Sequence, residues 1–313
     1  MSKTLYLVVP CYNEEEVLPE TSKRLKEIMS GLIGSEKISP ESRICFVDDG
    51  SRDRTWEMIE GLHNEDPLFR GVKLSRNRGH QNALLGGMMT VREDCDALIS
   101  LDADLQDDPD AILQMVDKWL AGADIVYGVR SARKTDTFFK RFTAEGFYKV
   151  MEWMGANVVF NHADYRLMSA RALDALAEYR EVNLFLRGMV PTIGYRTEIV
   201  TYERNERFAG ESKYPLKKML ALAWNGITSF STRPLDLIVT LGVVLCIIAA
   251  VMLLVCAGRA IWGTSPEAAE VFSYSLWLLG GIQLIALGVV GEYVGKIYAE
   301  VKGRPRYIIE KYL

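Results

Sequence analysis

Hydrophobic and polar positions follow two alternating patterns along the first 130 residues. Five short runs of apolar, mostly β-branched residues are separated by stretches in which apolar positions recur with helical spacing. The runs are centred near Leu5, Cys45, Val72, Ile99 and Val126. Strands that alternate with helices are typical of a doubly wound sheet. The pattern therefore predicts a Rossmann-like α/β domain with a mostly parallel sheet.

Each predicted strand is followed by a cluster of polar or conformationally special residues. These clusters occupy residues 10–15, 48–53, 75–81, 102–109 and 128–133. In a doubly wound sheet, ligands bind outside the carboxyl ends of the strands. We therefore expect the five clusters to converge on one crevice, which is the strongest functional indication in the pattern.

Two long runs without a formal charge follow later in the chain. Residues 237–258 form an uncharged run of 22 residues, and residues 271–291 form a second run that carries more glycine and the polar Gln283. A helix rises 1.5 Å per residue, so runs of this length cross a hydrocarbon core of roughly 30 Å. The runs predict two transmembrane helices, and an apolar hairpin buried in a soluble protein is the alternative.

The distribution of basic residues predicts how such helices are oriented. The connector between the two runs has one basic and two acidic residues, whereas the chain after the second run is basic. The basic residues of this tail are Lys296, Lys302, Arg304, Arg306 and Lys311. By the positive-inside rule, both long ends are expected in the cytoplasm. The N-terminal apolar run is too short for a signal peptide.

Composition excludes several classes of protein. The 313 residues contain 37 Lys and Arg against 41 Asp and Glu, which gives a formal net charge of −4 and no basic excess for a nucleic-acid backbone. A hydrophobic content of 49% argues against disorder. The five cysteines form no CxxC pair and there are three histidines, so neither a disulfide framework nor a zinc site is expected.

The cluster DADLQDDP offers candidate metal ligands. The sequence has no GxGxxG after a strand and no P-loop, so phosphates must be neutralised in another way. Asp102 and Asp104 lie two residues apart at a strand end, where both can reach one hard cation such as Mg²⁺ or Mn²⁺. The alternative is a helix start, with Asp107 or Asp108 as the cap and Pro109 at the first helical position.

Six motifs occur in order along the chain: PCYNEEE, VDDGSRDRT, LSRNRGHQNAL, LDADLQDDP, YRLMSARAL and RFAGESKYPLKKM. Together with the two apolar runs, they resemble the polyprenyl-phosphate glycosyltransferases of glycosyltransferase family 2, which include dolichol-phosphate mannose synthases and bactoprenol glucosyltransferases. The resemblance covers nearly the whole chain and is strongest for the bactoprenol branch. It implies a GT-A fold and an inverting hexose transfer from a nucleotide-diphosphate sugar, UDP-glucose first, to undecaprenyl phosphate. The implied product is a lipid-linked sugar on the cytoplasmic leaflet of the bacterial inner membrane, used to modify surface polysaccharide such as O-antigen.

The resemblance also assigns roles to individual positions. Nucleotide-sugar binding falls to Pro10, Tyr12, Glu14, Val47, Asp49, Asp102, Ala103, Asp104, Gln106, Arg130, Arg207 and Lys213. The metal ligands would be Asp102, Asp104 and Gln106, and the catalytic residues Asp104, Asp164, Arg207 and Lys213. The basic residues that could hold the lipid phosphate are Arg130, Arg133, Lys140 and Arg141.

The predicted organisation has four parts. Residues 1–212 form the cytoplasmic GT-A domain, 213–235 an interfacial juxtamembrane region, 236–295 the two transmembrane helices, and 296–313 a cytoplasmic basic tail. Amphipathic spacing predicts interfacial helices at 138–154 and 216–230, and ordinary helices packed on the sheet are the alternative. A GxxxG pair at Gly291 and Gly295 could pack helices but implies no oligomeric state, and a homo-oligomer stays open.

Several alternatives stay open from the sequence. Many bactoprenol glucosyltransferases have Lys-Glu where this chain has His80 and Gln81, so UDP-galactose, a UDP-N-acetylhexosamine, a UDP-aminoarabinose derivative and GDP-mannose remain candidate donors. A lipid monophosphate is largely ionised at neutral pH, so Asp164 is expected to orient groups rather than remove a proton. A salt bridge from Asp164 to Arg166 is the alternative. An inert membrane-anchored scaffold that binds lipid or sugar is the rival from another class.

Overall fold

The computed structural model describes residues 2–131, 162–203 and 268–313, together with the single positions 234, 235, 238, 240, 244, 247 and 251. The predicted interfacial helices at 138–154 and 216–230 lie outside the described residues, and so does almost all of the first apolar run, 237–258.

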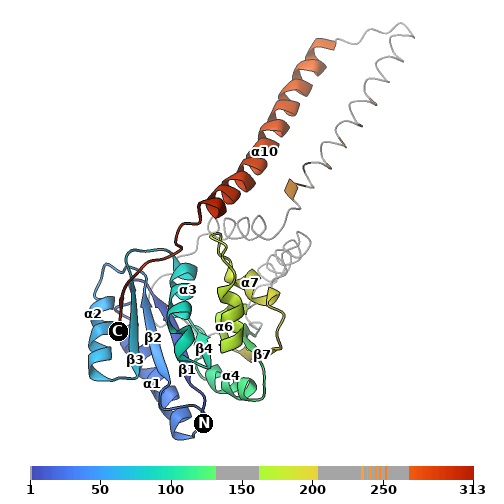
Figure 1. Ribbon diagram of the computed structural model, residues 1–313. Coiled ribbons are helices and arrows are strands. Elements are labelled where there is room, and N and C mark those ends of the chain that lie inside the picture. Colours follow the sequence, from blue (N-terminus) through green and yellow to red (C-terminus); the bar gives the residue numbers. More distant parts are fainter. Residues whose placement is uncertain are drawn as a thin grey trace.

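The described residues form an α/β domain around one sheet (Figure 1). Its strands are β1 (Leu5–Cys11), β2 (Arg43–Asp48), β3 (Phe69–Leu74), β4 (Ala97–Ser100), β5 (Ile125–Arg130), β6 (His162–Ser169), β7 (Thr197–Tyr202) and β8 (Ile309–Tyr312). The helices are α1 (Leu18–Gly34), α2 (Thr55–Glu65), α3 (His80–Val91), the 3-10 helix η1 (Arg92–Asp94), α4 (Ala111–Leu120), α6 (Ala170–Ala177), α7 (Leu186–Thr192) and α10 (Ala268–Lys302).

The order of strands in the sheet is β7-β5-β6-β4-β1-β2-β3-β8. Strands β1, β2, β3 and β4 are parallel neighbours, and β6 lies antiparallel between β4 and β5. Since β6 is antiparallel to both, β5 runs in the same direction as β4, so β1 to β5 all end at one edge of the sheet. The expectation of a mostly parallel α/β sheet is confirmed, and each of the five predicted strands is present.

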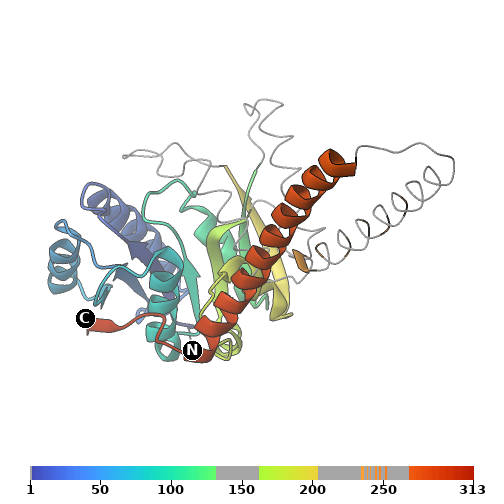
Figure 2. The same cartoon turned by 90° about the horizontal axis from the view of Figure 1, so that it is seen from above.

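The core has two layers because both faces of the sheet are covered. In β1, Leu5, Leu7 and Val9 pack with α1 and α4, whereas Tyr6 and Val8 pack with α3. Every residue of β1 is buried, as is typical of a parallel strand between two helical layers. Figure 2 shows the domain from above, with helices on both sides of the sheet.

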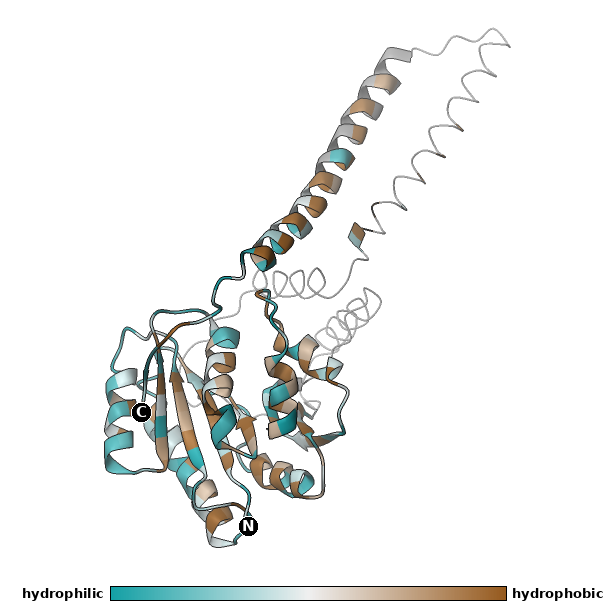
Figure 3. Cartoon of the chain, viewed as in Figure 1, coloured by the Kyte–Doolittle hydropathy of each residue, from teal (hydrophilic) through white to brown (hydrophobic). Residues whose placement is uncertain are grey.

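Helix α10 extends away from the α/β domain as one continuous helix of 35 residues (Figure 1). The second apolar run, 271–291, lies inside it, and large hydrophobic side chains of this helix are exposed, including Phe272, Leu276 and Ile285. Figure 3 shows hydrophobic positions along much of the helix. Among the described residues, no helix combines the length with the apolar character needed to cross a membrane.

The tail after α10 returns to the sheet. The predicted basic tail, 296–313, is divided between the last turns of α10 and β8, which pairs antiparallel with β3. The backbone N–H of Ser75 donates to the carbonyl of Ile308, and that of Leu313 donates to the carbonyl of Gly71. The last residues of the chain therefore form the outer strand of the α/β domain, which the sequence analysis did not predict.

Candidate active site

The turns after β1 and β2 are tied together at the carboxyl edge of the sheet. The side-chain oxygen of Asn13, whose φ is 54°, accepts a hydrogen bond from the backbone of Arg52 at 2.9 Å. In return, Ser51 Oγ accepts from the Asn13 backbone N–H, and Thr55 Oγ1 accepts from that of Glu14. Two of the predicted polar clusters therefore form one connected surface.

Asp49 fastens the next turn along the edge. Its two carboxylate oxygens accept the backbone N–H groups of Arg78 at 2.7 Å and Gly79 at 2.9 Å. The neighbouring Gly50 has a φ of 66°, and a Cβ placed there would lie 2.5 Å from the backbone nitrogen of Asn77. Only glycine allows the two turns to approach this closely. Asp49, predicted to bind nucleotide, thus also fixes the start of α3.

The first residue of α3 is His80, which reaches across to two carboxylates. Its Nε2 atom lies 3.4 Å from Oδ1 of Asp102 and 3.6 Å from Oδ2 of Asp164. Burial alone would lower the pKa of His80, but its interaction with Asp164 and the negative charges of Asp102 and Asp164 outweigh burial and raise that pKa to about 9. His80 is therefore a cation at neutral pH, held between the ends of β4 and β6.

Asp164 is the centre of a buried ionic network. Its side chain is 6% exposed, and its Oδ1 accepts from Nη2 of Arg166, which is fully buried, at 2.6 Å. Arg187, at the start of α7, donates to both oxygens of the same carboxylate at 3.3 and 3.1 Å. Burial favours a raised pKa for Asp164, but Arg187, His80 and Arg166 together hold it well below its usual range. This geometry favours an orienting role over proton removal.

The acidic strand end after β4 offers oxygen ligands for a cation. Oδ1 of Asp102 is buried and has no hydrogen-bond partner among the described residues, and burial raises the pKa of this carboxyl. Oδ1 of Asp104 accepts the backbone N–H of Gln106 at 3.2 Å. The carboxylates of Asp102 and Asp104 are hard oxygen donors of the kind that fits Mg²⁺ or Mn²⁺, and Oδ1 of Asp102 forms an ion pair with His80 but no hydrogen bond among the described residues.

Asp102 and Asp104 alone supply too few ligands to complete the coordination of a metal ion. Within the described ranges, no three His, Cys, Asp or Glu side chains are grouped so that they could hold a metal ion. Mg²⁺ is commonly bound through one or two carboxylates, with substrate phosphates and water as the other ligands. The residues therefore fit a cation that arrives with a diphosphate better than one bound by protein alone.

Arg130 has a structural partner that the sequence analysis did not expect. Its guanidinium forms a two-pronged ion pair with Asp107, with Nε to Oδ1 at 2.9 Å. The hydroxyl of Tyr202 donates to the same oxygen at 2.7 Å, and Asp107 is 3% exposed.

The prediction that Asp107 or Asp108 caps a helix with Pro109 in first position is wrong, because α4 begins at Ala111 and its N-cap residue, Asp110, makes no side-chain cap.

The other predicted residues fall into two groups. Pro10, Val47 and Ala103 are buried at strand ends, where they shape the edge through backbone and packing, and Tyr12 is 37% exposed beside them. The carbonyl of Ala103 accepts a 2.6 Å hydrogen bond from Thr21 Oγ1, which fixes this strand end against α1. The second group lies outside the described residues and consists of Arg133, Lys140, Arg141, Arg207 and Lys213.

Besides Arg166, which was named only as an alternative ion-pair partner of Asp164, two residues of the site were not predicted as site residues. His80 was noticed only as a departure from related sequences, and Arg187 carried no motif. The signal in the sequence for His80 was its position directly after Gly79. In the structure Gly79 is the N-cap residue of α3, with a φ of 87°. Nothing in the sequence near Arg187 points to Asp164, because their contact depends on how α7 packs on β6.

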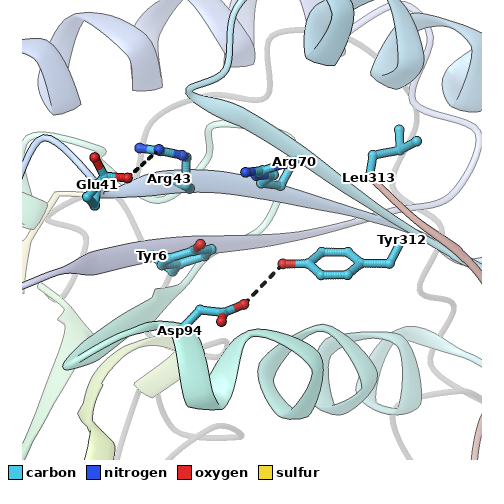
Figure 4. Close-up of a pocket in the computed structure, with 7 residues that line it drawn as sticks. All are labelled: Tyr6, Glu41, Arg43, Arg70, Asp94, Tyr312 and Leu313. Carbon is cyan, nitrogen blue, oxygen red and sulfur yellow. Dashed lines mark hydrogen bonds and ion pairs between the residues drawn. The ribbon is translucent and has the colours of Figure 1, made fainter.

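A cavity of about 360 Å³ lies at the opposite edge of the sheet (Figure 4). Its lining residues are Tyr6, Glu41, Arg43, Arg70, Asp94, Tyr312 and Leu313, from the starts of β1, β2 and β3 and from β8. None of the predicted site residues that the structure describes lines it. The chemistry argued above belongs to the carboxyl edge, not to this cavity.

The fold and the site define an α/β protein whose ligand site combines an acidic strand end with a buried Asp–Arg–His network. The sequence matches the family described as Glycosyl transferase family 2 over residues 6–177. The chain belongs to glycosyl transferase family 2.

Relatives extend this similarity over nearly the whole chain. The protein is 50% identical to the uncharacterized glycosyltransferase YkoT of Bacillus subtilis, with 98% of this chain and 91% of the relative covered. It is 40% identical to the SfII prophage-derived bactoprenol glucosyl transferase of Shigella flexneri, with 97% of each covered. The predicted resemblance to the bactoprenol branch is confirmed. Among solved structures, mannosyl-3-phosphoglycerate synthase from Rubrobacter xylanophilus matches with 14% identity, a TM-score of 0.48 and 71% of each chain covered.

Proposed function

We propose that this protein transfers a hexose, most simply glucose, from a nucleotide-diphosphate sugar to a polyprenyl phosphate, with inversion at the anomeric carbon. The observation that carries the proposal is the meeting of Asp102, His80 and Asp164 at the carboxyl edge, where an α/β sheet binds its ligand. The 40% identity to a bactoprenol glucosyl transferase over 97% of the chain supports the lipid acceptor and the glucose.

The donor end of the proposed reaction requires stabilisation of a leaving diphosphate. Asp102 and Asp104, with Gln106, would hold a divalent cation, which when bound neutralises negative charge on the diphosphate. UDP-glucose is the first candidate donor because of the branch resemblance. Arg207 and Lys213 are proposed as further cations for the diphosphate, from their positions in the RFAGESKYPLKKM motif.

The acceptor end needs orientation rather than a strong base. A lipid monophosphate has a second pKa near 6, by analogy with phosphorylated side chains, so its oxygens are already nucleophilic at neutral pH. Asp164 keeps its charge through Arg166 and Arg187 and fixes His80 by contact with Nε2. The cationic His80, whose side chain is 38% exposed, is therefore available to an anionic substrate at the edge.

We also propose that the protein is anchored in the bacterial inner membrane through the apolar runs 237–258 and 271–291, with both termini cytoplasmic. The exposed hydrophobic side chains of α10 support this location, since Leu276, Ile285 and Leu287 are each more than half exposed. The basic tail supports the cytoplasmic side through the positive-inside rule. A lipid acceptor would then meet the site at the membrane surface.

The test is transfer of radiolabelled sugar to undecaprenyl phosphate by the purified full chain in lipid nanodiscs. The panel contains UDP-glucose, UDP-galactose, UDP-N-acetylglucosamine, a UDP-aminoarabinose derivative and GDP-mannose, each with Mg²⁺, Mn²⁺ or chelator. We expect a chelator-sensitive lipid product from UDP-glucose. A product from another donor would correct the sugar, and folded, lipid-bound protein without any product would refute the enzyme in favour of the scaffold.

A further inference from the structure

The end of α10 binds residues 178–185, the segment between α6 and α7, which we call the gripped segment. One carboxylate oxygen of Glu300 accepts the backbone N–H of Val182 at 2.8 Å. The other accepts both the backbone N–H of Asn183 at 2.8 Å and its side-chain amide at 2.7 Å. The carbonyl of Lys296, one turn earlier in α10, accepts from the same amide at 3.4 Å. A single carboxylate thus fixes two consecutive peptide units of a non-helical segment.

The chain after α10 supports the same contact. Nη2 of Arg306 donates to the carbonyl of Tyr179 at 3.1 Å, at the start of the gripped segment. The ring of Tyr307 packs on Gly86 of α3, where an added Cβ would lie 3.2 Å from a ring carbon. Two consecutive residues of the connection between α10 and β8 therefore contact the segment before α7 and helix α3.

The gripped segment reaches the site within four residues. The backbone N–H of Leu186 donates to Oε1 of Gln81, next to His80, at 3.1 Å, and the carbonyl of Leu186 accepts from buried Arg166 at 3.3 Å. Arg187 then binds the carboxylate of Asp164. Asn183, held by Glu300, therefore lies three residues before Leu186 and four before Arg187, and both of these contact the network around Asp164.

We propose that Glu300 is a positioning residue that holds Leu186 and Arg187 in the active site, so that the placement of α10 controls the geometry around Asp164. The part of this inference that concerns turnover rests on the proposed transfer reaction. Glu300 touches no reacting group, and it acts through the backbone of Val182 and Asn183. Helix α10 also has exposed apolar side chains, so whatever surrounds this helix would influence its position. Through Glu300, a change in that position would move Leu186 and Arg187 in the active site.

The experiment compares the full chain in lipid nanodiscs with Glu300→Gln and with Lys311→Ala. Gln has the same length but replaces one carboxylate oxygen with an NH2 donor, so one of the two positions that accept a backbone N–H would face that N–H with a donor. Lys311 forms a tail contact with Glu60 at 2.7 Å, away from the gripped segment, and serves as the matched control. Hydrogen exchange of residues 182–188 gives a readout that does not require activity.

We expect Glu300→Gln to speed exchange of residues 182–188 and to lower the transfer rate, each by about tenfold, the scale of losing one charge-assisted hydrogen bond. Lys311→Ala should leave both unchanged. In an Arg187→Met background, Glu300→Gln should lower transfer by less than about twofold, because both changes act on one contact. A merely stabilising Glu300 would instead give the same fold-loss in both backgrounds.

Each result decides the inference. Unchanged exchange in Glu300→Gln, or faster exchange with normal transfer, would overturn it. If the wild-type chain transfers no sugar, the proposed function fails separately, and exchange at residues 186–188 still decides whether Glu300 positions Arg187. If Glu300→Gln does not fold, Asn183→Ala removes the side-chain bond to Glu300 and should give the same pattern at smaller amplitude.

Discussion

Oδ1 of Asp164 and Nη2 of Arg166 are 2.6 Å apart, in a part of β6 where the arginine side chain is entirely buried. A buried guanidinium needs its counter-charge, since an unpaired charge in the protein interior is costly. The pair therefore ties the integrity of the domain to the residue at the centre of the candidate site.

Replacing Asp164 with Asn should destabilise the protein as well as reduce transfer. Removing one partner of a buried ion pair costs about 3–5 kcal/mol in the free energy of unfolding. Chemical denaturation of the detergent-solubilised protein would measure this loss. The control is Asp174→Asn, which breaks an exposed pair with Arg92 and should change stability by less than about 1 kcal/mol. Equal stabilities of the two variants would contradict the role assigned to the buried pair.

Arg130 was predicted to bind phosphate, and its pair with Asp107 predicts a further effect. Arg130→Met should lower the free energy of unfolding by about 3 kcal/mol, because Asp107 would remain buried without its cation. Tyr202→Phe, which removes one hydrogen bond to the same carboxylate, should cost about 1 kcal/mol. Thermal melting of both variants distinguishes the roles, since a residue that only holds phosphate would leave the melting temperature unchanged.

His80 should make stability depend on pH in the alkaline range. Its pKa is raised from 6.5 to about 9 in the folded protein, so its contribution is fully present below pH 6.5 and is lost as the pH rises through about 9. The difference in melting temperature between wild type and His80→Gln should therefore shrink over that interval. His63→Gln, in α2, is the comparison. A difference that stays constant from pH 6 to pH 10 would argue against a charged His80.

Metal dependence should centre on Asp104. Asp104→Asn should lower chelator-sensitive transfer by on the order of 100-fold, because the charge on the leaving diphosphate is less well neutralised, and should leave melting close to wild type. Asp108→Asn is the matched control in the same turn, since the Asp108 carboxylate accepts the local backbone N–H of Asp110 at 3.0 Å. Near-normal turnover in Asp104→Asn would remove this residue from the proposed metal site.

The parallel strands could be predicted because buried strands consist almost entirely of apolar residues, which are visible in the sequence. Strands β1 and β2 are apolar on both faces, which is what a central parallel strand requires. Strand β6 was harder to predict because Asp164 and Arg166 interrupt its apolar residues. These two charged residues form a buried ion pair, so the sequence of β6 does not show the continuous apolar run of a buried strand. Strand β8 has four exposed residues, two of them charged, and exists through pairing with β3 rather than through apolar content.

The site was predictable in its location but not in its contacts. The polar clusters after β1, β2, β3 and β4 do gather at one edge, as expected from parallel strands. Asp49 and Arg130 were assigned to substrates from motifs, yet the structure shows that both also hold protein groups, namely the backbone of Gly79 and the carboxylate of Asp107. Such partners come from distant segments, and residue type alone does not encode them.

The antiparallel pairing of β3 with β8 has a consequence for the order of synthesis. Lys73 and Glu310, which form a 3.1 Å ion pair between these strands, are 237 positions apart in the chain. While the ribosome makes the intervening residues, the outer edge of β3 presents unpaired backbone groups that can recruit another strand. A nascent chain stalled before Ile309 should therefore depend on chaperones or aggregate, because β8 is not yet available to pair with β3.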